Sequence, residues 1–111
     1  MESIERRILY FRTEDGRVPY WEWRASLHDT KTRAIIDARI ARLRAGNFGH
    51  CAPVGEGILE LKSNYGPGFR IYFGQVGSQI VLLLCGGDKS TQNKDVSKAK
   101  GFWQDYKART R

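Results

Sequence analysis

Residues 58–85 read ILELKSNYGPGFRIYFGQVGSQIVLLLC, and their pattern decides the fold expected for the chain. Two glycine-containing links, NYGPG and Gly77-Ser78, divide this stretch into three runs rich in branched and aromatic side chains. Such runs are typical of β-strands, and short links of this kind join antiparallel neighbours. The last run is apolar throughout, as expected of a strand buried on both faces. The sequence therefore predicts three successive antiparallel strands, at residues 58–62, 69–76 and 79–85.

The middle strand separates apolar from polar side chains. Successive side chains of a strand point to opposite faces of the sheet. Phe69, Ile71 and Phe73 therefore share one face, whereas Arg70 and Tyr72 share the other. We expect this second face to be the polar one.

The region before these strands predicts one more strand and two helices. Residues 4–13 mix branched and aromatic side chains, and the strand that they form must pair beside one of the later strands. Pro19 suits the first turn of a helix, and Asp29 can cap a second helix that Gly46 ends. The stretch 47–57 is rich in glycine and is expected to be a loop. The inner faces of the two helices carry Tyr20, Trp23, Leu27, Ile36, Ile40 and Leu43.

The stretch GGDKSTQNKD (86–95) follows the last strand and leads into a terminal helix, for which Ser90 or Thr91 is the expected cap. The element order is β-α-α-β-β-β-α. We expect one α+β domain over residues 1–111, with a twisted antiparallel sheet, two N-terminal helices and one C-terminal helix. The apolar stripe of the terminal helix consists of Val96, Ala99, Trp103 and Tyr106.

Composition limits the class of protein. The chain has 111 residues, 41% of them hydrophobic, which is enough for one packed core. No stretch approaches the roughly 20 apolar residues of a membrane span, and the first residues lack the apolar segment of a signal peptide. We therefore expect a cytoplasmic protein without membrane contact. Cys51 and Cys85 form no metal-ligand pattern, Cys85 is expected to be a buried reduced thiol, and no cofactor is expected.

The net charge of +7 is gathered in residues 31–44 and 89–111. Such clustering implies an anionic partner, either nucleic acid or an acidic protein segment, unless both regions are simply solvated helix faces.

Several kinds of active site are excluded by the motifs. The chain has no GxxxxGK[ST] loop, no Gly-x-Ser-x-Gly elbow and no Cys/His cluster. His28 and His50 are expected at the surface. What remains is a set of cations on the predicted hairpins. Lys62 approaches Arg70 across the first hairpin, with Tyr72 beside it, and Lys89 can reach the same side from the end of the last strand. Three converging cations suit a phosphodiester, although each of them can instead be solvated or paired with a carboxylate such as Glu60 or Asp88.

The element order, the run ILELKSNYGPGFRIYF and the segment GGDKSTQNKDVSKAKGFWQDYK together resemble the RelE/ParE toxin superfamily, and more narrowly its HigB-like "addiction module killer" branch. The resemblance extends from about Ile8 to Lys107. It implies the toxin of a type II toxin–antitoxin pair. RelE-like members cut mRNA in the ribosomal A site, and ParE-like members inhibit DNA gyrase without cutting nucleic acid. The implied partners are a cognate antitoxin, often a helix-turn-helix protein, and mRNA on the ribosome.

The resemblance also implies roles for individual residues. Arg70 and Lys89 match the family's sheet arginine and its cation after the last strand, and would stabilise charge while an RNA 2′-hydroxyl attacks the adjacent phosphorus without a metal. Lys62 would hold the flanking backbone or assist proton transfer. Some relatives have tyrosine or histidine where this chain has Asp95, and Tyr72 is a substitute candidate, so the general base is open.

Four further cations are expected to bind RNA: Arg39, Arg42, Lys94 and Lys98. The main hypothesis is therefore an mRNA endonuclease. The alternatives are a non-catalytic toxin that inhibits gyrase and a basic binding module without toxicity.

Overall fold

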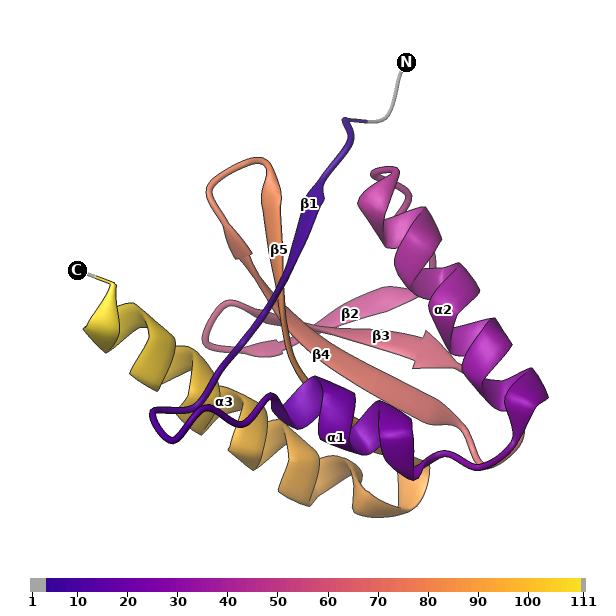
Figure 1. Ribbon diagram of the computed structural model, residues 1–111. Coiled ribbons are helices and arrows are strands. Elements are labelled where there is room, and N and C mark those ends of the chain that lie inside the picture. The colour runs from indigo at the N-terminus through magenta and orange to yellow at the C-terminus, as the bar shows by residue number, and fades with distance from the viewer. Residues whose placement is uncertain (1–3, 111) are drawn as a thin grey trace.

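The computed structural model describes residues 4–110, in which three helices surround a five-stranded sheet (Figure 1). The α+β class predicted from the sequence is confirmed. The elements, in chain order, are β1 (Arg7–Tyr10), α1 (Pro19–Ser26), α2 (Thr30–Arg44), β2 (Cys51–Gly55), β3 (Ile58–Ser63), β4 (Phe69–Val76), β5 (Ile80–Asp88), a 3-10 turn (Lys89–Thr91) and α3 (Gln92–Arg109).

The strands lie in the order β1-β5-β4-β3-β2. Both predicted hairpins are present, because β3 pairs antiparallel with β4 and β4 pairs antiparallel with β5. β1 pairs with β5 as an edge strand, but it runs parallel to β5, from Arg7 opposite Ile80 to Tyr10 opposite Leu83. The sheet is therefore mixed, and the prediction of a wholly antiparallel sheet is wrong. The two helices between β1 and the hairpins supply the long crossover that parallel pairing requires.

An additional strand, β2, occupies the segment predicted as a glycine-rich loop. It pairs antiparallel with β3, with Cys51 opposite Leu61, through a turn in which Gly55, Glu56 and Gly57 all have positive φ. The element order is therefore β-α-α-β-β-β-β-α rather than the predicted one. Pro53 is tolerated because β2 is an edge strand, and the side of an edge strand that faces no other strand needs no N–H donor.

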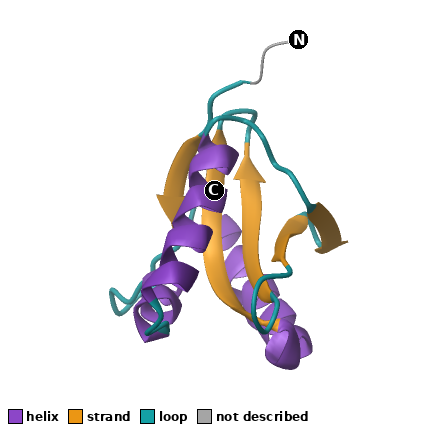
Figure 2. Ribbon diagram, turned by 90° about the vertical axis from the view of Figure 1, so that its right-hand side faces the viewer, coloured by secondary structure: helices purple, strands orange, loops and turns teal. Residues whose placement is uncertain are grey.

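The helices α1 and α2 cover one face of the sheet, and α3 covers the other (Figure 2). Asp29 accepts a hydrogen bond from the Lys31 backbone N–H at the start of α2, so the predicted cap is confirmed. The core on the α1–α2 side contains, among others, Tyr20, Ile36, Ile40, Leu43, Phe69, Ile71, Phe73, Val81 and Leu83.

The core on the α3 side confirms the predicted apolar stripe. Ala99 and Trp103 are buried against β4 and β5, and Val96 and Tyr106 pack at the margin. A Cβ atom at Gly74 would lie 2.5 Å from the Trp103 ring, so glycine lets the indole lie flat on β4. Of the helices in residues 4–110, none is both long enough and apolar enough to cross a membrane.

Candidate functional site

The predicted cations meet at the end of β3, β4 and β5 that lies beside the first turn of α3. Lys62 and Arg70 are opposite each other in the β3–β4 ladder, and Gly87 of β5 is opposite Arg70 on its other side. Lys89 follows the end of β5 directly. The register therefore confirms that Lys62 and Arg70 are cross-strand neighbours, as the NYGPG turn predicts.

Gly68 separates the side chains of Arg70 and Lys89. A Cβ atom at this glycine would lie 3.5 Å from Nη1 of Arg70 and 3.4 Å from Cβ of Lys89. Its φ of +82° lies in the region that favours glycine. Gly68 therefore leaves room for both of these side chains beside the same point in the backbone.

The Arg70 guanidinium is held almost entirely inside the protein, with 7% of the residue exposed. Its Nη1 donates to the backbone carbonyls of Phe69, at 3.0 Å, and Ser63, at 3.3 Å. Its Nε is buried and has no hydrogen-bond partner within the described chain. The carbonyls fix the orientation of the guanidinium, and its buried Nε–H donor remains unused.

Lys62 lies beside the carboxylate of Glu60, the pairing that the sequence allowed as an alternative to a free cation. Its Nζ lies 3.9 Å from Oε1 of Glu60, which is itself 1% exposed. The other oxygen, Oε2, accepts a hydrogen bond of 2.8 Å from Nε2 of Gln92, the first residue of α3. Glu60 therefore connects the cation on β3 to the start of α3. The sequence could have predicted this contact, because Glu60 stands two residues before Lys62 and both side chains therefore lie on the same face of β3.

Tyr72 is fully buried opposite Glu60 in the β3–β4 ladder. Its hydroxyl makes no hydrogen bond of ordinary geometry with the described residues. Burial raises the pKa of Tyr72 well above its usual value, and the nearby Glu60 carboxylate raises it further. The predicted polar face of β4 is therefore not a solvent-facing surface, because α3 covers it and Tyr72 belongs to the core beneath that helix.

Asp95 is the third charged residue buried in this region, with 7% exposed. Its Oδ2 accepts a 2.5 Å hydrogen bond from the Thr91 hydroxyl. A Cβ atom at Gly87 would lie 1.8 Å from the same oxygen, so the carboxylate rests directly on the backbone of β5. We call the buried side chains under the first turn of α3 the polar layer: Glu60, Arg70, Tyr72 and Asp95.

The turn that carries Lys89 is capped differently from the prediction. Oδ1 of Asp88 accepts a 2.8 Å hydrogen bond from the Ser90 backbone N–H and a second one from the Ser90 hydroxyl. The Thr91 side chain completes the capping box with the Asp88 backbone N–H. Thr91 occupies the N-cap position of α3, as predicted, but its side chain caps no backbone N–H of that helix. The side-chain cap is supplied by Asp88, at the start of the 3-10 turn that precedes α3. The Ser90 side chain lowers the pKa of Asp88.

The chain is similar to a protein of known sequence. It is 47% identical over 83 residues to an uncharacterized protein of Haemophilus influenzae, a match that covers 75% of this chain and 84% of that protein. The chain belongs to the family of that protein. No protein-family model matches the chain.

The four cations that were predicted to bind RNA differ in their surroundings. Arg42, Lys94 and Lys98 are exposed. Arg39 is not, because its Nη1 donates a 2.8 Å hydrogen bond to the Lys62 backbone carbonyl and joins α2 to β3. Since α2 and α3 cover opposite faces of the sheet, these residues do not form one continuous surface.

The remaining candidate groups lie outside the polar layer or are unreactive. His28 and His50 are exposed, as predicted. Cys85 is a buried free thiol, also as predicted, and burial raises its pKa to about 12. Residues 4–110 contain no group of three or more His, Cys, Asp or Glu side chains placed to hold a metal ion.

Proposed function

We propose that the chain is the toxin of a type II toxin–antitoxin pair of the RelE/ParE superfamily, in its HigB-like branch, and that it cuts mRNA on the ribosome. The sequence resemblance in residues 58–73 and 86–107 supports this proposal. A five-stranded mixed sheet with three helices is compatible with it.

The observation that carries the proposal is the meeting of three cations at one corner of the sheet. Lys62 and Arg70 are opposite each other, and a Cβ atom at Gly68 would contact both the Arg70 guanidinium and the Lys89 side chain. Lys89 is exposed, and Lys62 keeps 30% of its side chain exposed. A phosphodiester can therefore approach these two cations from solvent.

In the proposed reaction the RNA 2′-hydroxyl attacks the adjacent phosphorus. The bond from phosphorus to the 5′-oxygen breaks, and the products are a 2′,3′-cyclic phosphate and a 5′-hydroxyl, which receives the proton that the 2′-hydroxyl loses. Lys89 and Arg70 stabilise the negative charge that develops on the phosphorane oxygens. DNA has no 2′-hydroxyl, so it is not a substrate.

The test compares Lys89→Ala with Lys107→Ala, which removes an exposed cation at the other end of α3. Cleavage of message on translating ribosomes is mapped by primer extension. We expect Lys89→Ala to lower the cleavage rate by about 10²–10³-fold, Lys107→Ala to leave it unchanged, and Lys89→Arg to restore part of it. Equal cleavage by Lys89→Ala and wild type would rule out the assigned role of Lys89. If wild type cuts no message, the nuclease proposal fails.

A second candidate function is a toxin that inhibits DNA gyrase without chemistry. The burial of Tyr72 and Glu60 favours this candidate, since neither group is exposed to take a proton from substrate. Gyrase supercoiling of relaxed plasmid, measured with the protein present, distinguishes the two. Inhibition of supercoiling together with uncut message would establish the second candidate, whereas cut message with normal supercoiling would exclude it.

A further inference from the structure

The strand β5 extends beyond its pairing with β1. β1 pairs with residues 80–83 of β5, and the last hydrogen bond between them runs from the Phe11 N–H to the Leu83 carbonyl, at 2.9 Å. On its other edge, β5 pairs with β4 as far as Asp88. Residues 84–88 therefore have a strand on one side and, within the described chain, none on the other.

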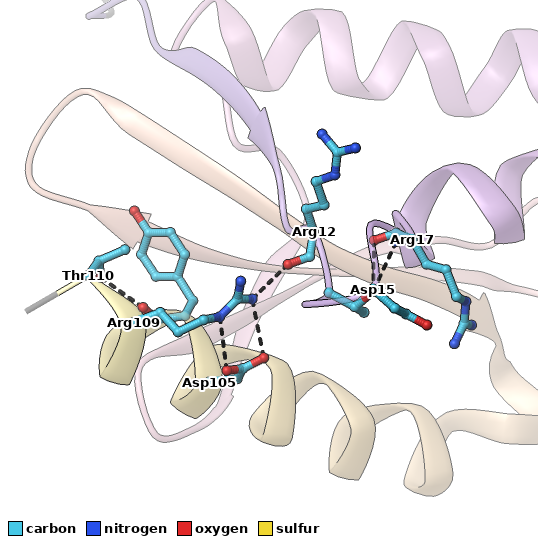
Figure 3. Close-up of polar contacts among 8 residues, drawn as sticks. Arg12, Asp15, Arg17, Asp105, Arg109 and Thr110 are labelled. Carbon is cyan, nitrogen blue, oxygen red and sulfur yellow. Dashed lines mark hydrogen bonds and ion pairs between the residues drawn. The ribbon is translucent and has the colours of Figure 1, made fainter.

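The segment after β1 is held by a side chain of α3 (Figure 3). Nη2 of Arg109 donates a 2.7 Å hydrogen bond to the Arg12 carbonyl, while Asp105 holds the same guanidinium at 3.0 Å. The backbone then turns sharply, since the N–H of Thr13 donates to the Arg17 carbonyl at 2.8 Å. These contacts direct the chain into α1 rather than along β5.

The open edge forms the floor of a groove between α1 and α3 with a volume of about 780 Å³. Cys85, Gly86 and Asp88 lie along the floor, and the walls include Trp23 of α1 and Phe102 of α3. A Cβ atom at Gly86 would lie 2.3 Å from the Trp23 ring, so the wall is packed directly against the strand. The Trp23 wall and the strand floor are therefore in direct contact.

We propose that this groove binds an extended apolar segment of a partner protein, which adds a strand to β5 in continuation of β1. Unpaired N–H and C=O groups along a strand edge are satisfied together by another extended backbone. Residues 84–88 lie along this open edge, which corresponds to about 17 Å of strand, and of their backbone N–H groups that of Asp88 is already bonded to the Thr91 hydroxyl. An added strand points its side chains alternately toward α1 and α3, so it should be apolar on both faces.

The charges around the groove determine what flanks the apolar segment. The floor ends at Asp88, the next residue is the exposed Lys89, and Arg70 lies opposite Gly87. Lys98 lines the groove and makes no ion pair within the described chain. The flank that leaves the groove at this end meets cations and should be acidic, which suits a chain of net charge +7. A nucleic acid fits the floor poorly, because its phosphates only accept hydrogen bonds and would face Asp88.

This proposal goes beyond the toxin function and does not depend on it, since it rests on the open strand and the groove. The test uses a peptide library in which five positions are drawn from Val, Ile, Leu, Phe and Thr and are followed by Glu-Asp-Glu. Binding to the full chain is measured by fluorescence anisotropy. The backbone control repeats the best peptide with N-methyl groups at alternate residues, which removes N–H donors while keeping every side chain.

We expect binding that N-methylation weakens at least about tenfold, or about 1.4 kcal/mol. Lys98→Glu should weaken binding more than Arg42→Glu, a matched charge reversal on exposed α2. Amide hydrogen exchange in residues 84–88 should slow when the peptide binds. No binding by any library member at about 1 mM, or equal binding of the N-methylated peptide, would overturn strand addition. Slowed exchange at residues 84–88 with a single-stranded RNA in place of the peptide would also overturn it.

Discussion

Gly87→Ala is the sharpest test of how the polar layer is built. The added Cβ atom would lie 1.8 Å from Oδ2 of Asp95, 2.7 Å from its Cγ and 3.0 Å from the Thr91 hydroxyl. Ordinary contact requires about 3.5 Å, so the carboxylate and the first turn of α3 have to move by about 1.7 Å. Asp95 has little room to turn aside, because it is buried and holds the Thr91 hydroxyl. Overpacking of this kind costs about 1–3 kcal/mol.

Gly101→Ala is the matched control, since nothing lies within 4 Å of its added Cβ atom and the residue lies inside α3. We expect Gly101→Ala to raise the free energy of unfolding by about 0.5–1 kcal/mol, and Gly87→Ala to lower it by about 1–3 kcal/mol. Urea unfolding followed by tryptophan fluorescence measures both. Asp95→Ala removes the clashing atoms, so it should cost about 1–2 kcal/mol less in the Gly87→Ala background than in wild type. Additive costs, or a Gly87→Ala variant as stable as Gly101→Ala, would refute the assigned packing.

Three further predictions concern individual side chains. Asp88→Ala should lower the free energy of unfolding at pH 7 by about 0.5–2 kcal/mol. Because the folded-state pKa of Asp88 is lowered by Ser90, this contribution exists above the unfolded pKa and is lost as the pH falls through the folded one. The difference in urea unfolding between wild type and variant should therefore shrink below about pH 4. Cys85, whose pKa burial raises to about 12, should react with a thiol reagent at pH 8 only in urea; rapid labelling of the native protein would contradict its burial. Tyr72→Phe should change the free energy of unfolding by less than about 0.5 kcal/mol, because its hydroxyl makes no hydrogen bond of ordinary geometry within the described chain. A larger loss would mean that the hydroxyl is bonded to the nearby Glu60 carboxylate.

The parts of the fold that the sequence predicted are those set by local patterns. The two hairpins follow from NYGPG and Gly77-Ser78, and the inner face of α2 follows from apolar spacing. The direction of β1 could not be predicted, since an apolar run does not say whether its partner is parallel. β2 was missed because strand pairing overrides composition. Pro53 and three surrounding glycines indicate a loop, yet the edge of β3 recruits the segment.

The site was predicted as a set of cations but not as a buried layer. Alternation and turn placement were sufficient to bring Lys62 beside Arg70. The sequence did not indicate that Arg70 is buried, because its burial depends on where α3 lies. The contribution of Glu60 was missed for the same reason. A glutamate between two leucines in a strand is exposed unless a helix covers that face, and α3 covers it.

The attachment of α3 to the sheet changes in character along the helix. Its middle is held by apolar contacts, with Ala99 and Trp103 packed on β4 and β5. Its first turn is held by polar contacts, among them the hydrogen bond from Gln92 to Glu60 of β3 and the one that the Cys85 thiol of β5 donates to the Asp95 carbonyl. Forming such buried polar contacts stabilises weakly, because desolvation offsets the attraction between charges, but breaking one leaves a buried charge without its partner and is strongly destabilising. The first turn of α3 is therefore positioned more specifically by these contacts than it is stabilised by them, and Glu60 is the residue that joins it to Lys62 on β3.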